Sequence, residues 1–282
     1  MTSAKRSRPD QCPGVLRPWP ADDGLLVRLR LPGGRVAYAA LLRLMEIAEE
    51  FGDGAVHVTT RTNLQLRALP AAACGRLLPD EVEAALADTG LLPSRAHDVG
   101  RNILASPQTG LAGGRADLRP VVAELDRLLL ADAELGTLSG RFLHVLDDGR
   151  GDVLDRSCDL GLVALDAERG QLRIGEHWGE VVRLPEAPAR LVQLAREFLA
   201  VRGGGPQAPW HIRELPALLA PPQPADPELP QALAPLQYGP VPGGVHVPVP
   251  PMGLRRDHLR FLNASELVVT PWRGVLVPWE SR

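Results

Sequence analysis

The alternation of hydrophobic and polar residues predicts where the first secondary-structure elements lie. From Gly24 to Leu31, apolar and polar residues alternate once past Leu26, which is typical of a half-buried strand. Residues 40–51 place apolar side chains at helical spacing with glutamates opposite, so we expect an amphipathic helix there. The pattern then predicts two strands, followed by a helix or a pair of turns, at 55–60, 63–67 and 70–88. The order strand, helix, strand, strand, helix indicates a compact α+β unit.

A second region begins near residue 96 and has its own pattern. Amphipathic helices are expected over Arg119–Ala133 and Pro188–Val201. Short strands are predicted at 141–146, 161–165 and 171–175. Half of the 28 prolines lie between residues 205 and 251, and we place an extended linker at 216–235.

The final part of the chain repeats a pattern from the first unit. The segment Val58–Leu66 aligns with Val269–Val277, and each has a threonine at its second position before an alternating strand. A single unit with one exposed sheet face would bury little apolar surface, whereas two copies can cover each other. We therefore predict a second copy of the first unit, with a chance likeness between two ordinary strands as the alternative.

Composition and charge exclude several classes of protein. Of the 282 residues, 45% are hydrophobic and 23% are charged, which excludes global disorder, and the net charge of −3 argues against a general nucleic-acid binder. No stretch approaches the ~18 consecutive apolar residues of a membrane span. No apolar segment follows the basic N-terminus, so we expect a cytoplasmic protein with no membrane partner.

Arginines are the residues best suited to bind a ligand. Lys5 is the only lysine, so an anion site in this chain must be built from arginine, whose planar fork holds carboxylates with paired hydrogen bonds. If the strands share a sheet, Arg30 and Arg67 face one cavity. The alternative is that most of these arginines lie on solvated strand faces or in surface ion pairs. The candidate residues are Arg28, Arg30, Arg61, Arg67, Arg101, Asn102 and Arg141.

The other reactive residue types are too sparse to define a site. Cys12, Cys74 and Cys158 are widely spaced and cannot form a four-cysteine iron–sulfur or zinc site within one chain. No pattern of a nucleophile with its base is visible, so no catalytic residue is assigned and no metal ligand is expected. Cys158 as a lone haem or metal ligand is a weaker alternative. The run Asp147–Asp152 has a calcium-loop composition but lacks the terminal Glu of an EF-hand, so we expect a hairpin turn there.

Four motifs occur in the order seen in nitrite and sulfite reductases. They are Leu29–Gly34, Thr59–Leu66, Gly100–Ile103 and Leu138–Phe142. Within that superfamily the chain most resembles the precorrin-3B synthases of aerobic cobalamin biosynthesis. The segments that carry this resemblance are residues 8–17, 159–165 and 267–278, and it extends over residues 8–280.

The resemblance implies an α+β protein with two ferredoxin-like half-domains around a sirohaem-binding-type α/β domain. The half-domains would be residues 14–92 and 236–282, and the tetrapyrrole-binding domain 93–215. Members bind sirohaem, or act on a related tetrapyrrole, next to a [4Fe–4S] cluster. By this similarity Arg30, Arg61 and Arg101 contact the anion or the tetrapyrrole. Arg141 and Leu143 replace the two lysines that serve oxyanion reduction, which disfavours a true sulfite or nitrite reductase.

One departure from the family pattern concerns the cluster. In the family, Cys-x₅-Cys and Cys-x₃-Cys hold the cluster in a segment that would follow Trp279, whereas this sequence stops at Arg282. The chain would then be a natural short form, a gene fragment, or one half of a split enzyme with a cluster-bearing partner chain. The expected function is a precorrin-3B synthase-like oxidoreductase, a monooxygenase acting on a precorrin-3A-like tetrapyrrole. The alternative is a cluster-free tetrapyrrole-binding module or a truncated reductase-like protein without activity of its own.

Overall fold

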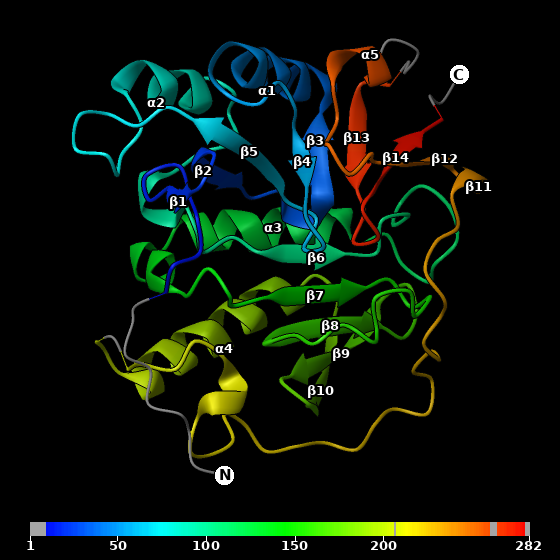
Figure 1. Ribbon diagram of the computed structural model, residues 1–282. Coiled ribbons are helices and arrows are strands. Elements are labelled where there is room, and N and C mark those ends of the chain that lie inside the picture. Colours follow the sequence, from blue (N-terminus) through cyan, green and yellow to red (C-terminus); the bar gives the residue numbers. More distant parts are fainter. Residues whose placement is uncertain (1–9, 206, 260–263, 280–282) are drawn as a thin grey trace. The chain divides into compact units, whose positions relative to one another are not determined.

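The computed structural model describes residues 10–205, 207–259 and 264–279, and the chain divides into two compact units (Figure 1). One unit, here named the repeat unit, comprises Pro13–Asp98 and Pro235–Arg282. The other, here named the mixed-sheet unit, comprises Met1–Cys12 and Val99–Ala234. None of the helices that the structure describes combines the length and the apolar character needed to span a bilayer.

The first half of the repeat unit is a four-stranded antiparallel sheet with two helices. The strand order is β1-β2-β5-β4. Leu25, Val27 and Leu29 of β2 alternate with half-buried residues and are at most 2% exposed, which confirms the predicted half-buried strand. They pack in one core with the apolar face of α1. The elements are β1 (Trp19–Ala21), β2 (Gly24–Leu29), β3 (Arg35–Ala37), α1 (Tyr38–Phe51), β4 (His57–Val58), β5 (Leu64–Leu69) and α2 (Asp80–Ala87).

The second half of the repeat unit has the same strand order. Its sheet runs β11-β12-β14-β13, and β3 of the first half adds a fifth strand beside β13. An ion pair between Arg35 and Glu266 joins those two strands. Its elements are β11 (Gly239–Val241), β12 (Gly244–Pro248), α5 (Arg256–Leu259), β13 (Glu266–Val269) and β14 (Gly274–Pro278). The sequence also predicts a short helix over residues 256–262, of which the structure describes residues 256–259.

The turns that align in the sequence also share their hydrogen bonds. The Asn63 amide donates to the Thr59 hydroxyl over 3.1 Å, and the Gly274 amide donates to the Thr270 hydroxyl over 3.2 Å. The intervening residue has left-handed backbone in both turns, with φ of 58° at Thr62 and 59° at Arg273. The matching strand order and turn geometry show that the predicted internal repeat is present.

The mixed-sheet unit is a five-stranded sheet of order β10-β9-β8-β7-β6. Strands β6, β7 and β8 run parallel, whereas β8, β9 and β10 run antiparallel. The two helices pack against each other, and their buried side chains share a core with one face of the sheet. The elements are β6 (Ile103–Ala105), α3 (Arg119–Leu130), β7 (His144–Asp147), β8 (Leu160–Ala164), β9 (Arg169–Ile174), β10 (His177–Arg183) and α4 (Ala187–Arg202).

Two sequence-based predictions for this unit need correction, and two strands were missed. The strand expected at 141–146 begins at His144, and strands β6 and β10 were not predicted. The hairpin turn expected at Asp147–Asp152 is wrong, because β7 and β8 are parallel and the segment between them is a crossover loop. The Asp147 carboxylate instead organises that loop by accepting hydrogen bonds from the amides of Gly149 and Gly151, over 2.9 and 2.8 Å.

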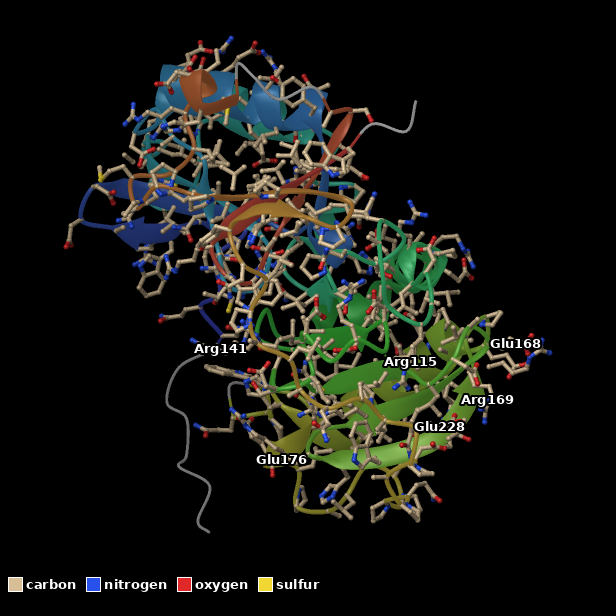
Figure 2. The ribbon with its side chains drawn as sticks, turned by 90° about the vertical axis from the view of Figure 1, so that its right-hand side faces the viewer. Arg115, Arg141, Glu168, Arg169, Glu176 and Glu228 are labelled. Carbon is tan, nitrogen blue, oxygen red and sulfur yellow. The ribbon has the colours of Figure 1, made fainter. Side chains whose placement is uncertain are left out.

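The proline-rich segment predicted as a linker is extended, and its second part is tied to the mixed-sheet unit. We name residues 221–234 the strap. The Gln171 side chain donates to the Pro224 carbonyl over 2.8 Å and accepts from the Asp226 amide over 2.9 Å. Arg169 pairs with Glu228 over 3.1 Å, and Figure 2 shows these two residues together with Arg115 at one end of the sheet. Backbone hydrogen bonds add to these side-chain contacts, from the Gln223 amide to the Trp178 carbonyl over 2.8 Å and from the Leu233 amide to the Gly151 carbonyl over 2.9 Å.

Candidate anion-binding site

A basic cavity of about 440 Å³ opens in the repeat unit. Strands β2, β4 and β5 supply one wall, and the segment after β12 and the β13–β14 turn supply the rest. Three arginines line it, Arg28, Arg67 and Arg273, with His57 and Gln65 as further polar groups. Several guanidinium groups around one cavity suit a ligand with several carboxylates, because each fork can bind one of them.

The strand register explains why three of these side chains lie in a row. Arg28 on β2 and His57 on β4 are both register partners of Gln65, which lies on β5 between them. Paired residues of antiparallel strands present their side chains to the same face. The Arg28 guanidinium donates to the Gln65 side-chain oxygen over 3.2 Å. The neighbouring residues Val27 and Leu64 point into the core, so the polar row occupies the opposite face of the same sheet.

Two carboxylates balance part of the positive charge. The Arg67 guanidinium donates to Asp23 over 3.1 Å, and this hydrogen bond lowers the pKa of Asp23. The His57 ring lies 2.7 Å from the Asp53 carboxylate. Both side chains of the Arg67–Asp23 pair are 40% exposed, so the pair is screened by water and an incoming carboxylate can compete for Arg67.

Comparison with known proteins assigns part of this unit. Residues 20–79 match the family described as the nitrite/sulfite reductase ferredoxin-like half domain. These residues are therefore similar to such a half domain. They include β2, β4 and β5 and therefore Arg28, His57, Gln65 and Arg67 of the cavity.

Two further comparisons extend beyond the half domain. A precorrin-3B synthase from Sinorhizobium sp is 33% identical over 141 residues, which is 49% of this chain and 28% of that protein. The solved structure of the NirA protein of Mycobacterium tuberculosis superposes with a TM-score of 0.68 at 17% identity, over 95% of this chain and 59% of that chain. The chain therefore spans less than two thirds of each relative. These findings confirm the resemblance drawn from the sequence and the α+β fold of the nitrite/sulfite reductase kind.

Two of the candidate residues line this cavity, Arg28 and Arg67. Arg30, expected to share it, lies just beyond the end of β2 and is only 2% exposed. Its guanidinium donates to the backbone carbonyls of Arg28 and Pro13, each over 3.0 Å, and so supports the half domain from inside. Arg61 lies half-buried in the turn between β4 and β5. The expectation that Arg30 and Arg67 face one cavity is therefore wrong for Arg30, and Arg28 takes its place.

The remaining predicted residues belong to the mixed-sheet unit. Arg101 is 6% exposed and forms a two-pronged ion pair with Asp126 of α3, over 2.7 and 2.8 Å. The side-chain amide of Asn102 donates to the backbone carbonyls of Val99 and Gly140, each over 3.1 Å. Both side chains thus hold the backbone in place just before β6 begins. Arg141 is exposed, and its guanidinium stacks on the Trp210 ring with 5.1 Å to the ring centroid.

Sequence analysis did not select His57, Gln65 or Arg273 as site residues. The cross-strand register that puts His57 and Gln65 beside Arg28 depends on pairing that no local pattern reveals. Arg273 occupies the position aligned with Thr62 in the repeat, and Thr62 does not line the cavity. The two residues share left-handed backbone, but Thr62 is 1% exposed whereas Arg273 is exposed.

The cysteines of the described chain do not fit a [4Fe–4S] cluster. Cys74 is exposed in the repeat unit, whereas Cys12 and Cys158 lie in the mixed-sheet unit. Burial raises the pKa of the Cys158 thiol to about 12, so it stays protonated, although cluster ligands are thiolates. We therefore derive no step through a cluster.

An acidic group in the mixed-sheet unit has the spacing of a metal site. Asp147, Asp148 and Asp152 are buried and close enough to share an ion. However, Asp148 is paired with Arg150 at 2.8 Å, and Asp152 accepts from the Ser106 hydroxyl over 2.6 Å. Burial also raises the pKa of Asp152 to about 7, which weakens it as an anionic ligand. These partners favour a structural role in the crossover loop.

Proposed function

We propose that this chain is a precorrin-3B synthase-like oxidoreductase of aerobic cobalamin biosynthesis, acting on a precorrin-3A-like tetrapyrrole. The observation that carries the proposal is the cavity with Arg28, Arg67 and Arg273, largely built from a nitrite/sulfite reductase ferredoxin-like half domain. Precorrins carry carboxylates around their rim, and arginines are the side chains best shaped to hold them. The similarity to a precorrin-3B synthase supports the same substrate class.

In this proposal the cavity residues bind and orient the macrocycle. Arg67 and Arg273 donate to peripheral carboxylates, while the hydrogen bond to Gln65 orients the Arg28 guanidinium. The hydroxyls of Thr59 and Thr60 add neutral donors on the same wall. A bound sirohaem-type tetrapyrrole would supply the redox chemistry of the family, and the residues seen here would fix its position and exclude water from its rim.

A second candidate function is a cluster-free module that binds a tetrapyrrole without oxidising it. The mismatch between the three cysteines and a cluster favours this candidate. Protein purified without oxygen distinguishes the two. Iron and sulfide bound in stoichiometric amounts would support the oxidoreductase, whereas tetrapyrrole binding without iron or sulfide would support the module.

Binding of uroporphyrin III tests the part of the proposal that both candidates share. This macrocycle carries two carboxylates on each pyrrole ring, whereas coproporphyrin III carries one. We expect uroporphyrin III to quench the tryptophan fluorescence of the chain at lower concentrations than coproporphyrin III, by roughly tenfold, because more carboxylates reach arginines. Equal binding of the two porphyrins, or no binding of either, would contradict the proposal.

A further inference from the structure

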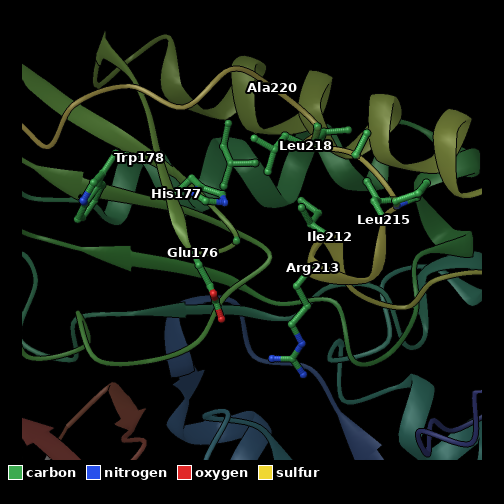
Figure 3. A pocket seen from close by; sticks show the side chains of 13 residues that line it. Glu176, His177, Trp178, Ile212, Arg213, Leu215, Leu218 and Ala220 are labelled. Carbon is green, nitrogen blue, oxygen red and sulfur yellow. The ribbon is translucent and has the colours of Figure 1, made fainter. Parts of the chain in front are cut away.

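The mixed-sheet unit contains a cavity of its own, of about 360 Å³ (Figure 3). It lies between the β9–β10 turn and residues 212–220, the segment that leads into the strap. Its floor is rigid, because Ile174 and Ile212 belong to the core and are each 7% exposed. This volume falls within the range of sites for small molecules.

Apolar side chains make up one part of the cavity wall. Leu215 and Leu219 pack against the core and are half-buried, whereas Leu218 is 57% exposed. In Figure 3, Leu215 and Leu218 lie on one side of the cavity, opposite the charged groups. An exposed leucine over a hollow leaves apolar surface in water, and a ligand with an apolar body would remove that surface from water.

The other side of the cavity carries one charge of each sign. Glu176 and Arg213 are both exposed, and Figure 3 shows their side chains extending to the same side, away from the leucines. They are too far apart to form an ion pair with each other, and within the described residues neither has an ion pair or side-chain hydrogen bond elsewhere. The adjacent carboxylate of Glu214 is already occupied, since it accepts from the amides of Trp210 and His211.

We propose that this cavity binds an apolar α-amino acid as its zwitterion. The ammonium group pairs with Glu176, the carboxylate pairs with Arg213, and the side chain lies among the leucines and isoleucines. A simple carboxylic acid would place its charge near Glu176 with no compensating group, and a simple amine would meet Arg213 in the same way. A zwitterion satisfies both charges, and arginine is the better of the two basic side chains for holding a carboxylate.

This proposal is independent of the tetrapyrrole function. The residues that carry it belong to the mixed-sheet unit, and the basic cavity belongs to the repeat unit. Loss of porphyrin binding therefore leaves the amino-acid site unaffected, and the reverse also holds.

Calorimetric titration of the full chain with L-phenylalanine tests the proposal, with 3-phenylpropionate and phenethylamine as analogues that lack one charge. We expect L-phenylalanine to bind and each analogue to bind roughly tenfold or more weakly, because each loses one charged contact. Binding of 3-phenylpropionate as tight as that of L-phenylalanine would overturn the zwitterion assignment, and absence of L-phenylalanine binding at about 10 mM would overturn the site itself.

Two neutralising variants, each with a matched control, locate the site. Arg213→Gln and Glu176→Gln should each weaken L-phenylalanine binding by roughly fivefold to tenfold, the effect of losing one partly exposed charged contact. Arg183→Gln and Glu168→Gln remove exposed charges of the same unit outside the cavity and should leave binding unchanged. If the cavity variants bind as the controls do, L-phenylalanine binds elsewhere and the proposal fails.

Discussion

The ion pair between Arg101 and Asp126 allows a sharp test of how burial changes the energy of a contact. Helix α3 carries two acidic residues that each form a two-pronged pair with an arginine, Asp126 with Arg101 and Glu124 with Arg127. All four distances are 2.7 or 2.8 Å. The Arg101 side chain is only 7% exposed, whereas that of Arg127 is 62% exposed. The two pairs therefore differ mainly in access to water.

Replacing Asp126 with alanine leaves a buried guanidinium without its carboxylate. Removing one partner of a fully buried pair costs about 3–5 kcal/mol, because the remaining charge is desolvated and uncompensated. The Asp126 side chain is 19% exposed, so water can enter the vacated space and partly solvate Arg101. We therefore expect Asp126→Ala to lower the free energy of unfolding by about 2–3 kcal/mol, towards the lower end of that range. Glu124→Ala removes a solvent-exposed pair and should change stability little.

Urea denaturation followed by circular dichroism measures both variants against the parent chain. A loss of about 2–3 kcal/mol corresponds to a shift of the thermal midpoint of roughly 4–12 °C for a protein of this size. Asp126→Asn serves as a third variant, since it keeps the shape and one acceptor and should lie between alanine and the parent. Equal effects of Asp126→Ala and Glu124→Ala would refute the reasoning that burial sets the energy of the Arg101 contact.

Three further predictions follow from single side chains. Burial lowers the pKa of His144 to about 4, below its ordinary value of 6.5. Its contribution to stability is therefore present above pH 6.5 and is lost as the pH falls towards 4. His144→Leu should make the loss of stability over that pH window smaller by up to about 3 kcal/mol, as measured by urea titrations at several pH values. Thr59→Val removes the hydroxyl that accepts a hydrogen bond from the Asn63 backbone amide, and should destabilise the repeat unit by about 1–2 kcal/mol. Thr59→Ser keeps that hydroxyl and serves as the control. Equal stability of the two variants would contradict this role. With a chromogenic disulfide reagent at neutral pH, exposed Cys74 should react quickly, because hydrogen bonds from the backbone lower its pKa. Partly buried Cys158 should react slowly, because its raised pKa of about 12 leaves almost no thiolate at neutral pH, and rapid labelling of a Cys74→Ser variant at Cys158 would contradict this.

Local patterns predicted the elements whose burial follows a regular period. Helix α1 and strand β2 show apolar residues at the helical and strand periods, and the structure contains both. Strand β6 escaped prediction because its three residues are all buried, so no alternation marks it. The loop after β7 was misjudged because its turn-like composition does not reveal whether the next strand returns parallel or antiparallel.

The candidate site could be predicted only in part, because its geometry depends on long-range pairing. The sequence pointed to arginine as the side chain of an anion site, and Arg67 lies in the cavity. It did not reveal that β2 ends at Leu29, after which Arg30 turns inward to a carbonyl 17 residues away. The repeat aligns Arg273 with Thr62, which is 1% exposed and does not line the cavity, so the alignment did not mark Arg273 as a site residue.

The central claim is that the arginines of the repeat unit hold the carboxylates of a tetrapyrrole. Titration of the Arg67→Ala/Arg273→Ala double variant with uroporphyrin III tests it most directly, with Arg43→Ala as the control, because Arg43 is an exposed arginine of the same unit outside the cavity. We predict that the double variant binds uroporphyrin III at least roughly thirtyfold more weakly than the parent, as expected from two lost charged contacts, while the control binds as the parent does. Equal affinity of the parent, the control and the double variant would contradict the account.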